Sequence, residues 1–311
     1  MKILILGAGG IGGILGGRLV ESGADVTFLV REKRKQQLQA QGLQIESPLG
    51  NAKLQVNTKL KSEIEPVYDL VLLTCKAYDL EPAIDTIRPA MSGHACVLPI
   101  LNGMAHIARL NQEFGKEHVL GGTIKMQVTL TADGTVQQLS DWQTLTFGEQ
   151  DGKESERGRA LKALFDKTRV EAKLSTEIMR DMWMKMVHLA TVAGMTCLMR
   201  ANVGEIVRTP EGGKLLKRFL LANAEIATHA GHRPDDKFLD TYLELFAQRD
   251  APYEASMLRD LEKGGQIESE QILGDMLRHC RRAGVDDSLH CAAYTHVKAY
   301  EERRDAARLP R

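Results

Sequence analysis

Glycines near the start of the chain have a spacing that lets backbone amides bind an anion. Residues 7–12 read GAGGIG and satisfy the pattern G-x-G-x-x-G. In this pattern Gly7 permits a tight turn, Gly9 has no Cβ to hold a diphosphate away, and Gly12 lets a helix approach a strand. The amides and the dipole at the helix start then attract the phosphates. Turn and packing roles are the alternative, and they suit the later glycines of the segment, Gly13, Gly16 and Gly17.

The charged residues after the second expected strand bear on the choice of nucleotide. An acidic residue at this place pairs with a free ribose 2′-hydroxyl, whereas an arginine accommodates a 2′-phosphate. Here Arg31 ends the strand, and Lys33 and Arg34 add positive charge. The cluster therefore favours NADP, although Glu32 keeps NAD open and a solvated charged loop is the structural alternative.

Polar residues also follow two further expected strands. Lys76 comes after DLVLLT at 69–74, and Asn102 comes after ACVLPIL at 95–101. Open α/β sheets bind ligands at the carboxyl ends of their strands, so both residues are candidates for a site there. Taken alone, Lys76 would more often be a solvated lysine, and Asn102 with Gly103 an ordinary turn pair.

A lysine in the second half of the chain stands in apolar surroundings. Lys185 is the sole charged residue between Asp181 and Arg200. Either its ammonium extends outward to solvent or it is held in a cleft. In a cleft, partial desolvation lowers the pKa of the lysine toward a value suited to proton donation.

The elements that must position these residues follow from the apolar pattern. Strands are expected at 2–6, 25–30, 69–74 and 95–101, with helices at 11–21 and 81–91. This alternation predicts a parallel sheet covered on both faces. Between Gly122 and Gly148 three short strand segments, TIKMQVTL, TVQQL and TLTFG, predict an antiparallel extension.

After residue 151 we expect no further strand, and from about 154 onward the apolar residues recur at helical spacing. The fold class is therefore α/β: an N-terminal Rossmann-like doubly wound sheet in domain 1–172, followed by an all-α C-terminal domain at 173–311. No long linker separates the halves, so we expect them to leave a cleft between them.

Composition limits the partners. Lysine plus arginine equals aspartate plus glutamate, at 41 each in 311 residues, so no net field recruits nucleic acid or a membrane surface. The five cysteines form no C-x-x-C pair and have no ligand-like spacing with histidine, which argues against a metal site and a disulfide framework. The apolar start, Ile3 to Leu6, is too short for a signal sequence or a membrane span. We expect a cytoplasmic protein with reduced cysteines.

Together these segments resemble the ketopantoate reductase (2-dehydropantoate 2-reductase) family over nearly the whole chain. The segments that carry the resemblance are GAGGIG at 7–12, Arg31, CKAYD with Lys76, LNGM with Asn102, W-x-K at 183–185, and SMLRDLEKGGQIE at 256–268. The resemblance implies reduction of ketopantoate to pantoate, in pantothenate and coenzyme A biosynthesis, with hydride from the nicotinamide C4 of NADPH.

The resemblance also implies roles for individual residues. Lys185 is the general acid, and Glu268 is the second catalytic residue. The substrate, a small-molecule 2-oxoacid, is held by Asn102, Lys185, Ser256 and Glu268. The cofactor is held by Gly7, Gly9, Gly10, Ile11, Gly12, Arg31, Lys76 and Asn102. For Glu268 the alternative from the residues alone is an acidic first-turn residue that favours a helix dipole.

The chain departs from the family pattern beside the proposed acid. Leu189 and Ala193 stand where the family usually carries asparagines, and Tyr253 also replaces a common asparagine. His188 either restores one polar contact or, as we favour, is a helix histidine satisfied by its neighbours. These changes point away from ketopantoate toward another 2-oxoacid or a related carbonyl compound.

Two other function classes stay open. One is an NADP-dependent dehydrogenase of the hydroxyacid or opine-forming type, and the other is a non-catalytic NADPH sensor. Lys185 and Glu268 favour an enzyme over a sensor. The apolar C-terminal helices are candidates for a homodimer interface.

Overall fold

The computed structural model describes residues 1–309, which form two compact units. The first unit holds residues 1–101 and 106–181, and the second holds residues 102–105 and the chain from 182 onward. Helix α6 (Ile178–Met199) contains the point of division. The domain limit at residue 172 stays a prediction. Each unit is described by itself below.

The central sheet of the first unit is parallel throughout. Its order is β5 (Asn57–Lys59), β2 (Asp25–Leu29), β1 (Lys2–Leu6), β6 (Leu70–Leu73) and β7 (Cys96–Pro99). In register, Ile3 lies between Val26 and Leu70. Strands β6 and β7 are buried at every position, which accounts for their unbroken apolar runs. The prediction of a doubly wound parallel sheet is confirmed.

Helices alternate with these strands along the chain. They are α1 (Gly10–Glu21), α2 (Glu32–Gln41), α3 (Leu80–Ile87), α4 (Ala105–Phe114) and α5 (Glu156–Phe165). Short 3₁₀ turns supplement them: η1 (Lys61–Glu63), η2 (Ala77–Asp79), η3 (Arg88–Ser92) and η4 (Lys116–His118). The predicted crossover helix at 81–91 is thus α3 continued by η3, with Pro89 at the change.

Two smaller sheets complete the first unit. One has the order β4 (Ala52–Leu54), β3 (Leu43–Glu46), β10 (Val136–Gln138) and β9 (Val128–Leu130). The other has the order β12 (Glu171–Leu174), β11 (Thr144–Glu149) and β8 (Leu120–Lys125).

The antiparallel extension is confirmed for the pairs β8 with β11 and β9 with β10. The single expected strand TIKMQVTL is instead divided into β8 and β9, which belong to different sheets. The expectation that no strand follows residue 151 is wrong, because Glu171–Leu174 pairs in parallel with β11. Its four residues alternate exposed and buried too briefly to give a strand pattern.

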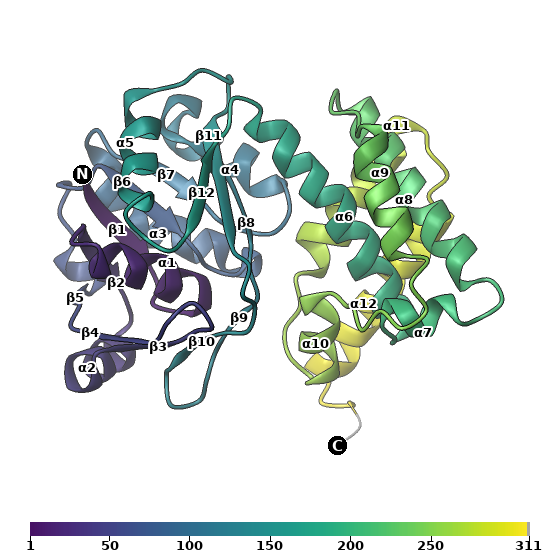
Figure 1. Ribbon diagram of the computed structural model, residues 1–311, viewed down its shortest axis with the longest axis horizontal. Helices are drawn as coiled ribbons and strands as arrows, with labels where there is room; N and C mark the ends of the chain where they lie inside the picture. Colours follow the sequence, from purple (N-terminus) through teal and green to yellow (C-terminus); the bar gives the residue numbers. More distant parts are fainter. Residues whose placement is uncertain (310–311) are drawn as a thin grey trace. The chain divides into compact units, whose positions relative to one another are not determined.

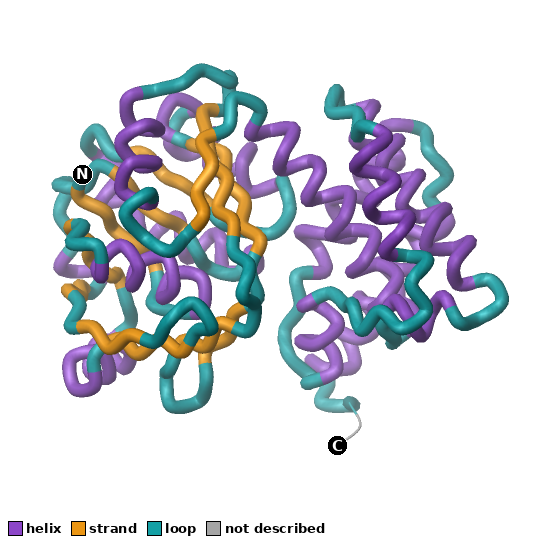
Figure 2. Tube along the Cα trace, in the orientation of Figure 1, coloured by secondary structure: helices purple, strands orange, loops and turns teal. Residues whose placement is uncertain are grey.

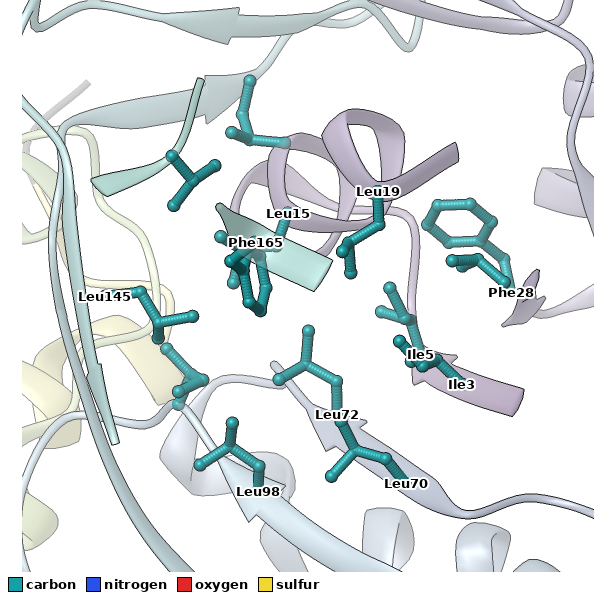
Figure 3. Packing of buried hydrophobic residues seen from close by; sticks show 14 of the residues in the cluster. Ile3, Ile5, Leu15, Leu19, Phe28, Leu70, Leu72, Leu98, Leu145 and Phe165 are labelled. Carbon is teal, nitrogen blue, oxygen red and sulfur yellow. The ribbon is translucent and has the colours of Figure 1, made fainter. Parts of the chain in front are cut away.

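The core of the first unit lies between helix α1 and the strands. Figure 3 shows Ile3, Leu15 and Leu72 together with Leu145 of β11 and Phe165 of α5. All five side chains are nearly inaccessible to solvent. Burying one such side chain contributes about 1.5–3 kcal/mol relative to leaving it exposed, so this packing holds α1 and its N-terminal turn against the sheet.

The described residues of the second unit form helices joined by loops, without a strand, as Figure 2 shows, which confirms the predicted all-α half. Its helices after α6 are α7 (Val203–Val207), α8 (Gly212–His229), α9 (Asp236–Leu245), α10 (Ser256–Glu262), the π-helical turn η5 (Glu270–Gly274), α11 (Asp275–Ala283) and α12 (Ser288–Asp305), all labelled or traced in Figure 1. Helix α6 is long and apolar enough to cross a bilayer, but 67% of its most apolar window is buried in the protein, as in a core helix.

Candidate active site

The glycine turn joins β1 to α1 in a conformation that requires its first glycine. Gly7 has φ +89°, a region that L side chains rarely adopt, and its N–H donates to the Leu29 carbonyl at 2.9 Å. Gly9 is the N-cap of α1 and supplies no capping side chain. The first intrahelical bond is from Gly13 N–H to Gly9 O, at 2.7 Å. The amides before Gly13 thus have no acceptor within the helix, as in any first turn.

An added Cβ separates the roles of the glycines in this turn. At Gly9 it would meet nothing within 4 Å, so the backbone is open to a ligand. At Gly12 it would lie 2.4 Å from Gly7 O and 2.6 Å from Thr74 Oγ1, which leaves no room for a side chain. The turn thus presents bare amides on an open side and packs tightly on its other side, an arrangement that fits a dinucleotide diphosphate.

The other glycines of α1 face packed neighbours. A Cβ at Gly13, Gly16 or Gly17 would lie 2.4–2.6 Å from the side chains of Val136, Phe28 and Ile45 respectively. Their expected packing role is confirmed. Gly10 is only slightly less crowded, at 3.1 Å from Val128 Cγ1, and Ile11 is half-buried.

The charged cluster forms the first turn of α2. Arg31 is the N-cap of this helix, with an exposed side chain. Glu32 accepts a hydrogen bond from Gln36 Nε2 at 2.9 Å, and Lys35 pairs with Glu63 at 2.7 Å. Arg34 differs from the expectation that it adds charge beside Arg31, because its guanidinium instead binds backbone carbonyls, that of Ala8 among them.

Lys76 lies at the end of β6, as predicted from the strand pattern. It is the N-cap of η2, its side chain is exposed, and its carbonyl accepts from Asp79 N–H at 2.9 Å. The neighbouring Thr74 donates its hydroxyl to Leu6 O at 3.0 Å, joining the carboxyl ends of β1 and β6. Lys76 and the glycine turn therefore belong to the same edge of the central sheet.

Asn102 and Glu268 come together although 166 residues separate them. Asn102 Nδ2 donates to Glu268 Oε2 at 3.1 Å, and the Glu268 side chain is only 5% exposed. The next residue, Gly103, has φ +92°, and a Cβ there would lie 2.4 Å from Gln271 O. All these residues belong to the second unit. A glycine is thus required where the asparagine meets the carboxylate.

Glu268 directly precedes a helical run rather than lying within its first turn. Its carbonyl accepts from Ile272 N–H at 3.2 Å, and the π-helical turn η5 follows. Such turns widen a helix by one residue and are frequent at functional sites. The buried carboxylate accepts a hydrogen bond from Asn102 at the N-terminal end of this run, so its surroundings fit both a substrate contact and a favourable interaction with the helix dipole. Ser256 is the first residue of α10 and is half-buried.

Lys185 lies on α6 with a half-buried side chain. Its neighbours Trp183 and Val187 are buried, at 5% and 0% exposure. Leu189, one helical turn further along, is half-buried and shares its face of the helix, whereas Ala193 is fully buried. Along this face of α6 the lysine is therefore followed by apolar side chains, one half-buried and one fully buried.

Two tyrosine rings contact His188, the residue that precedes Leu189 in α6. Tyr253 OH and His188 Nε2 are 2.8 Å apart, and Tyr242 stacks on the imidazole with ring centroids 4.4 Å apart. Burial raises the pKa of Tyr253 to about 12, so its phenol keeps its proton at neutral pH. The expectation that neighbours satisfy His188 is confirmed. The contact between Tyr253 and His188 could not be predicted from the sequence, because no local pattern links two residues 65 positions apart.

Among residues 1–309 no group of three metal-binding side chains comes together, and none of the five cysteines forms a disulfide bond. Burial raises the pKa of Cys96 to about 11 and of Cys197 to about 12, which makes both thiols unreactive at neutral pH.

Comparison with known proteins matches both units. Residues 3–152 match the family model "Ketopantoate reductase PanE/ApbA", and residues 177–301 match its C-terminal counterpart. An uncharacterized oxidoreductase, YkpB, of Bacillus subtilis is 32% identical over 304 residues, covering 98% of this chain and all of that one.

Two solved structures have the same fold. The crystal structure of 2-dehydropantoate 2-reductase from Methylococcus capsulatus has a TM-score of 0.87 at 25% identity, with 98% of each chain covered. A D-mandelate dehydrogenase in complex with NADH and anilino(oxo)acetate has a TM-score of 0.86 at 22% identity, covering 98% of this chain and 99% of that one.

Proposed function

Since this chain belongs to the ketopantoate reductase PanE/ApbA family of NAD(P)-dependent oxidoreductases, we propose that it is an NADPH-dependent reductase of a small 2-oxoacid. The observation that carries the proposal is the open, uncapped glycine turn at the start of α1, where Gly9 leaves the backbone bare. We place the protein in the cytoplasm, which agrees with its free cysteines.

The cofactor would be held by the amides of residues 9–12, with Lys76 at the same sheet edge. Asn102, at the end of β7, is assigned to both cofactor and substrate. Arg31 is the candidate for the 2′-phosphate because its guanidinium is exposed and has no partner among residues 1–309. Glu32, the residue that would favour NAD, already accepts from Gln36. These contacts support NADP over NAD.

The chemistry would be carried by Lys185. When bound, the reduced nicotinamide supplies the hydride. The Lys185 ammonium would donate a hydrogen bond and then its proton to the carbonyl oxygen of the oxoacid, where negative charge develops. Glu268, held by Asn102, would accept from a substrate hydroxyl, and Ser256 would donate to the carboxylate. No metal ion is needed for this sequence of contacts.

The residues beside Lys185 bear on the side chain of the substrate. Ketopantoate, and with it a role in pantothenate biosynthesis, is the candidate that family membership favours. Leu189 and the His188–Tyr253 pair instead line α6 beyond Lys185 with apolar and aromatic groups. That surface favours an oxoacid with an apolar side chain, which would make the protein a hydroxyacid-type dehydrogenase of the same chemistry.

The experiment is NADPH oxidation, followed by absorbance, with a panel of 2-oxoacids that includes ketopantoate. Replacing Lys185 with alanine should lower kcat by about 100-fold or more, as expected for a lost general acid, with NADPH binding preserved. Lys217→Ala, an exposed lysine of α8, is the matched control and should retain full activity. Undiminished kcat in Lys185→Ala would contradict the assignment, and wild-type protein that binds NADPH without reducing any oxoacid would favour a sensor.

A further inference from the structure

The side chain of Arg34 joins three segments of the first unit. Its Nη2 donates to the carbonyl of Ala8 at 2.9 Å, within the glycine turn. Its Nη1 donates to the carbonyl of Gly134 at 3.0 Å and to Gln37 Oε1 at 2.6 Å. One guanidinium on α2 therefore connects the start of α1 to the turn between β9 and β10.

Gln37 makes a second connection to the same turn. Its Nε2 donates to Asp133 O at 2.5 Å. Gly134 has φ +87°, and a Cβ there would lie 2.3–2.4 Å from Gln37 Nε2 and Arg34 Nη1. A side chain at this point would displace the ends of both α2 side chains, so the turn lies directly against them.

The hairpin that this turn closes, β9–β10 (128–138), packs on the first turns of α1. A Cβ at Gly10 would lie 3.1 Å from Val128 Cγ1, and one at Gly13 would lie 2.6 Å from Val136 Cγ2. Strand β9 forms an edge of its sheet, beside Gly10. The hairpin therefore packs beside the backbone amides of residues 9–12, which we propose bind the diphosphate.

The bond to Ala8 also sets the direction of an amide. A trans peptide is planar, so the carbonyl of Ala8 and the N–H of Gly9 point in opposite directions. When Arg34 fixes Ala8 O on the α2 side, it turns Gly9 N–H away from α2. The arginine thus orients a donor of the turn without contacting a ligand itself.

The charge of Arg34 is unusual for a residue with a structural role alone. No carboxylate lies within ion-pair distance of it among residues 1–309, its three acceptors are neutral, and its Nε is buried without a partner. Burial lowers the pKa of this arginine. A half-buried cation without a counter-ion, behind an anion-binding turn, favours negative charge in that turn.

We propose that Arg34 is a positioning residue for the dinucleotide: together with Gln37 it holds the glycine turn and the β9–β10 hairpin in the arrangement that receives the diphosphate. This inference rests on the proposed nucleotide function. It separates Arg34 from Arg31, because the diphosphate is common to NADPH and NADH, whereas the 2′-phosphate belongs to NADPH alone.

The test compares Arg34→Ala with the wild type by calorimetric titration of both reduced nucleotides and by amide hydrogen exchange of the nucleotide-free protein. Arg34→Ala should raise the Kd for NADPH and for NADH by the same factor, about tenfold or more, because charged hydrogen bonds are lost. Exchange at residues 128–138 should become faster. Lys33→Ala, an exposed change of charge in the same helix turn, should leave the exchange of the hairpin and the NADH Kd unaltered.

Two results would overturn the inference. A loss confined to NADPH would make Arg34 a ligand of the 2′-phosphate, and unchanged Kd values with a lower melting temperature would leave it a purely structural residue. If Arg34→Ala does not fold, Gln37→Ala should weaken both nucleotides by a common, smaller factor. A wild type that binds neither nucleotide refutes the proposed function and the positioning role with it. A wild type that binds both nucleotides, with Kd values that Arg34→Ala leaves unchanged, refutes the positioning role alone.

Discussion

At the scale of single residues, two arginines three positions apart on α2 have different surroundings. Arg31 is exposed at the helix N-cap, whereas Arg34 donates hydrogen bonds to the backbone carbonyls of Ala8 and Gly134. An exposed guanidinium is free to bind a phosphate bidentately, as arginine does well. The two side chains therefore allow cofactor selection and cofactor positioning to be measured separately.

Replacing Arg31 with alanine should weaken NADPH binding by about tenfold or more and leave NADH binding unchanged, since only the 2′-phosphate contact is lost. Titration calorimetry with each nucleotide measures this. Lys35→Ala, which breaks only the ion pair with Glu63, serves as the control of equal charge change. An equal loss for both nucleotides would contradict the assignment of Arg31.

The buried Glu268 carboxylate provides a second test at this scale. Glu268→Gln keeps the volume of the side chain but makes its oxygen a weaker acceptor, so kcat/KM for the oxoacid should fall about tenfold or more while the NADPH Kd is unchanged. Steady-state kinetics and nucleotide titration check the two parts. Glu262→Gln, at an exposed position of α10, is the control. Unaltered kcat/KM would show that Glu268 serves only the local fold with Asn102.

At the scale of elements, the strands with the clearest sequence pattern are largely or fully buried strands of the central sheet. Strands β1, β6 and β7 could be predicted from their apolar runs, because both faces of a central parallel strand are covered by helices. The strands β3, β4, β5 and β12 were missed. They have only three or four residues, largely half-exposed, and depend on pairing with distant segments.

In the candidate site, too, features set by neighbouring residues could be predicted, whereas contacts between distant residues could not. Gly7 and Gly12 could be assigned from the sequence because their spacing is local and their reason is steric. The Asn102–Glu268 hydrogen bond and the contact of Arg34 with Gly134 could not, since they join residues 166 and 100 positions apart. Only the fold decides which of many polar residues meet.

Two substitutions in the glycine turn should separate its contribution to protein stability from its contribution to NADPH binding. Gly12→Ala should destabilise the protein by about 1–3 kcal/mol, because its Cβ would collide with Gly7 O and Thr74 Oγ1. Gly9→Ala should change the free energy of unfolding by less than about 0.5 kcal/mol, since its Cβ meets open space. It should nevertheless weaken NADPH binding by about tenfold or more by holding the diphosphate away.

Chemical denaturation and nucleotide titration measure the two effects. Gly213→Ala is the control, a helical glycine of α8 with nothing within 4 Å of its Cβ, where alanine should be neutral or stabilise by up to about 1 kcal/mol. Gly9→Ala that binds NADPH as well as the wild type does would remove the main support for the proposed cofactor site.

At the scale of the whole molecule, each unit contains one of the two tryptophans. Trp142 lies in the first unit and Trp183 in the second. A chain with two compact units need not unfold in a single step, so one denaturation curve does not define one free energy. In a Trp142→Phe background, Trp183 fluorescence follows the second unit alone, and this reporter makes the stability of the helical unit measurable.

A buried network in that unit makes its stability depend on pH. His290, 2% exposed, lies with its Nε2 2.9 Å from Asn223 Oδ1, and Asn223 Nδ2 donates to Thr191 Oγ1 at 3.0 Å. Since the asparagine uses its amide nitrogen toward Thr191, the histidine donates from Nε2 to the amide oxygen. Its Nδ1 is buried without a partner. Burial lowers the pKa of His290 to about 4.

The sign of the pH effect follows from the two states of His290. Between the unfolded value of about 6.5 and the folded value of about 4, the unfolded chain binds a proton that the folded chain does not, so the unfolding free energy falls as the pH decreases through this window. The slope contributed by one such group is at most about 1.4 kcal/mol per pH unit. The carboxylate of Asp286, whose pKa hydrogen bonds from Ser288 lower to about 2, loses its contribution only below this window.

Denaturation of the second unit from pH 7 to 4.5, followed by Trp183, measures that slope. In His290→Gln the slope should become shallower by close to the contribution of one proton, whatever the absolute stability of the variant. A remaining slope is expected from His296, whose pKa burial also lowers. His229→Gln, an exposed histidine of α8, should keep the slope of the wild type. Equal slopes in wild type and His290→Gln would mean that His290 is reached by water before the unit unfolds, and that the Asn223 network opens separately from the rest of the helical core.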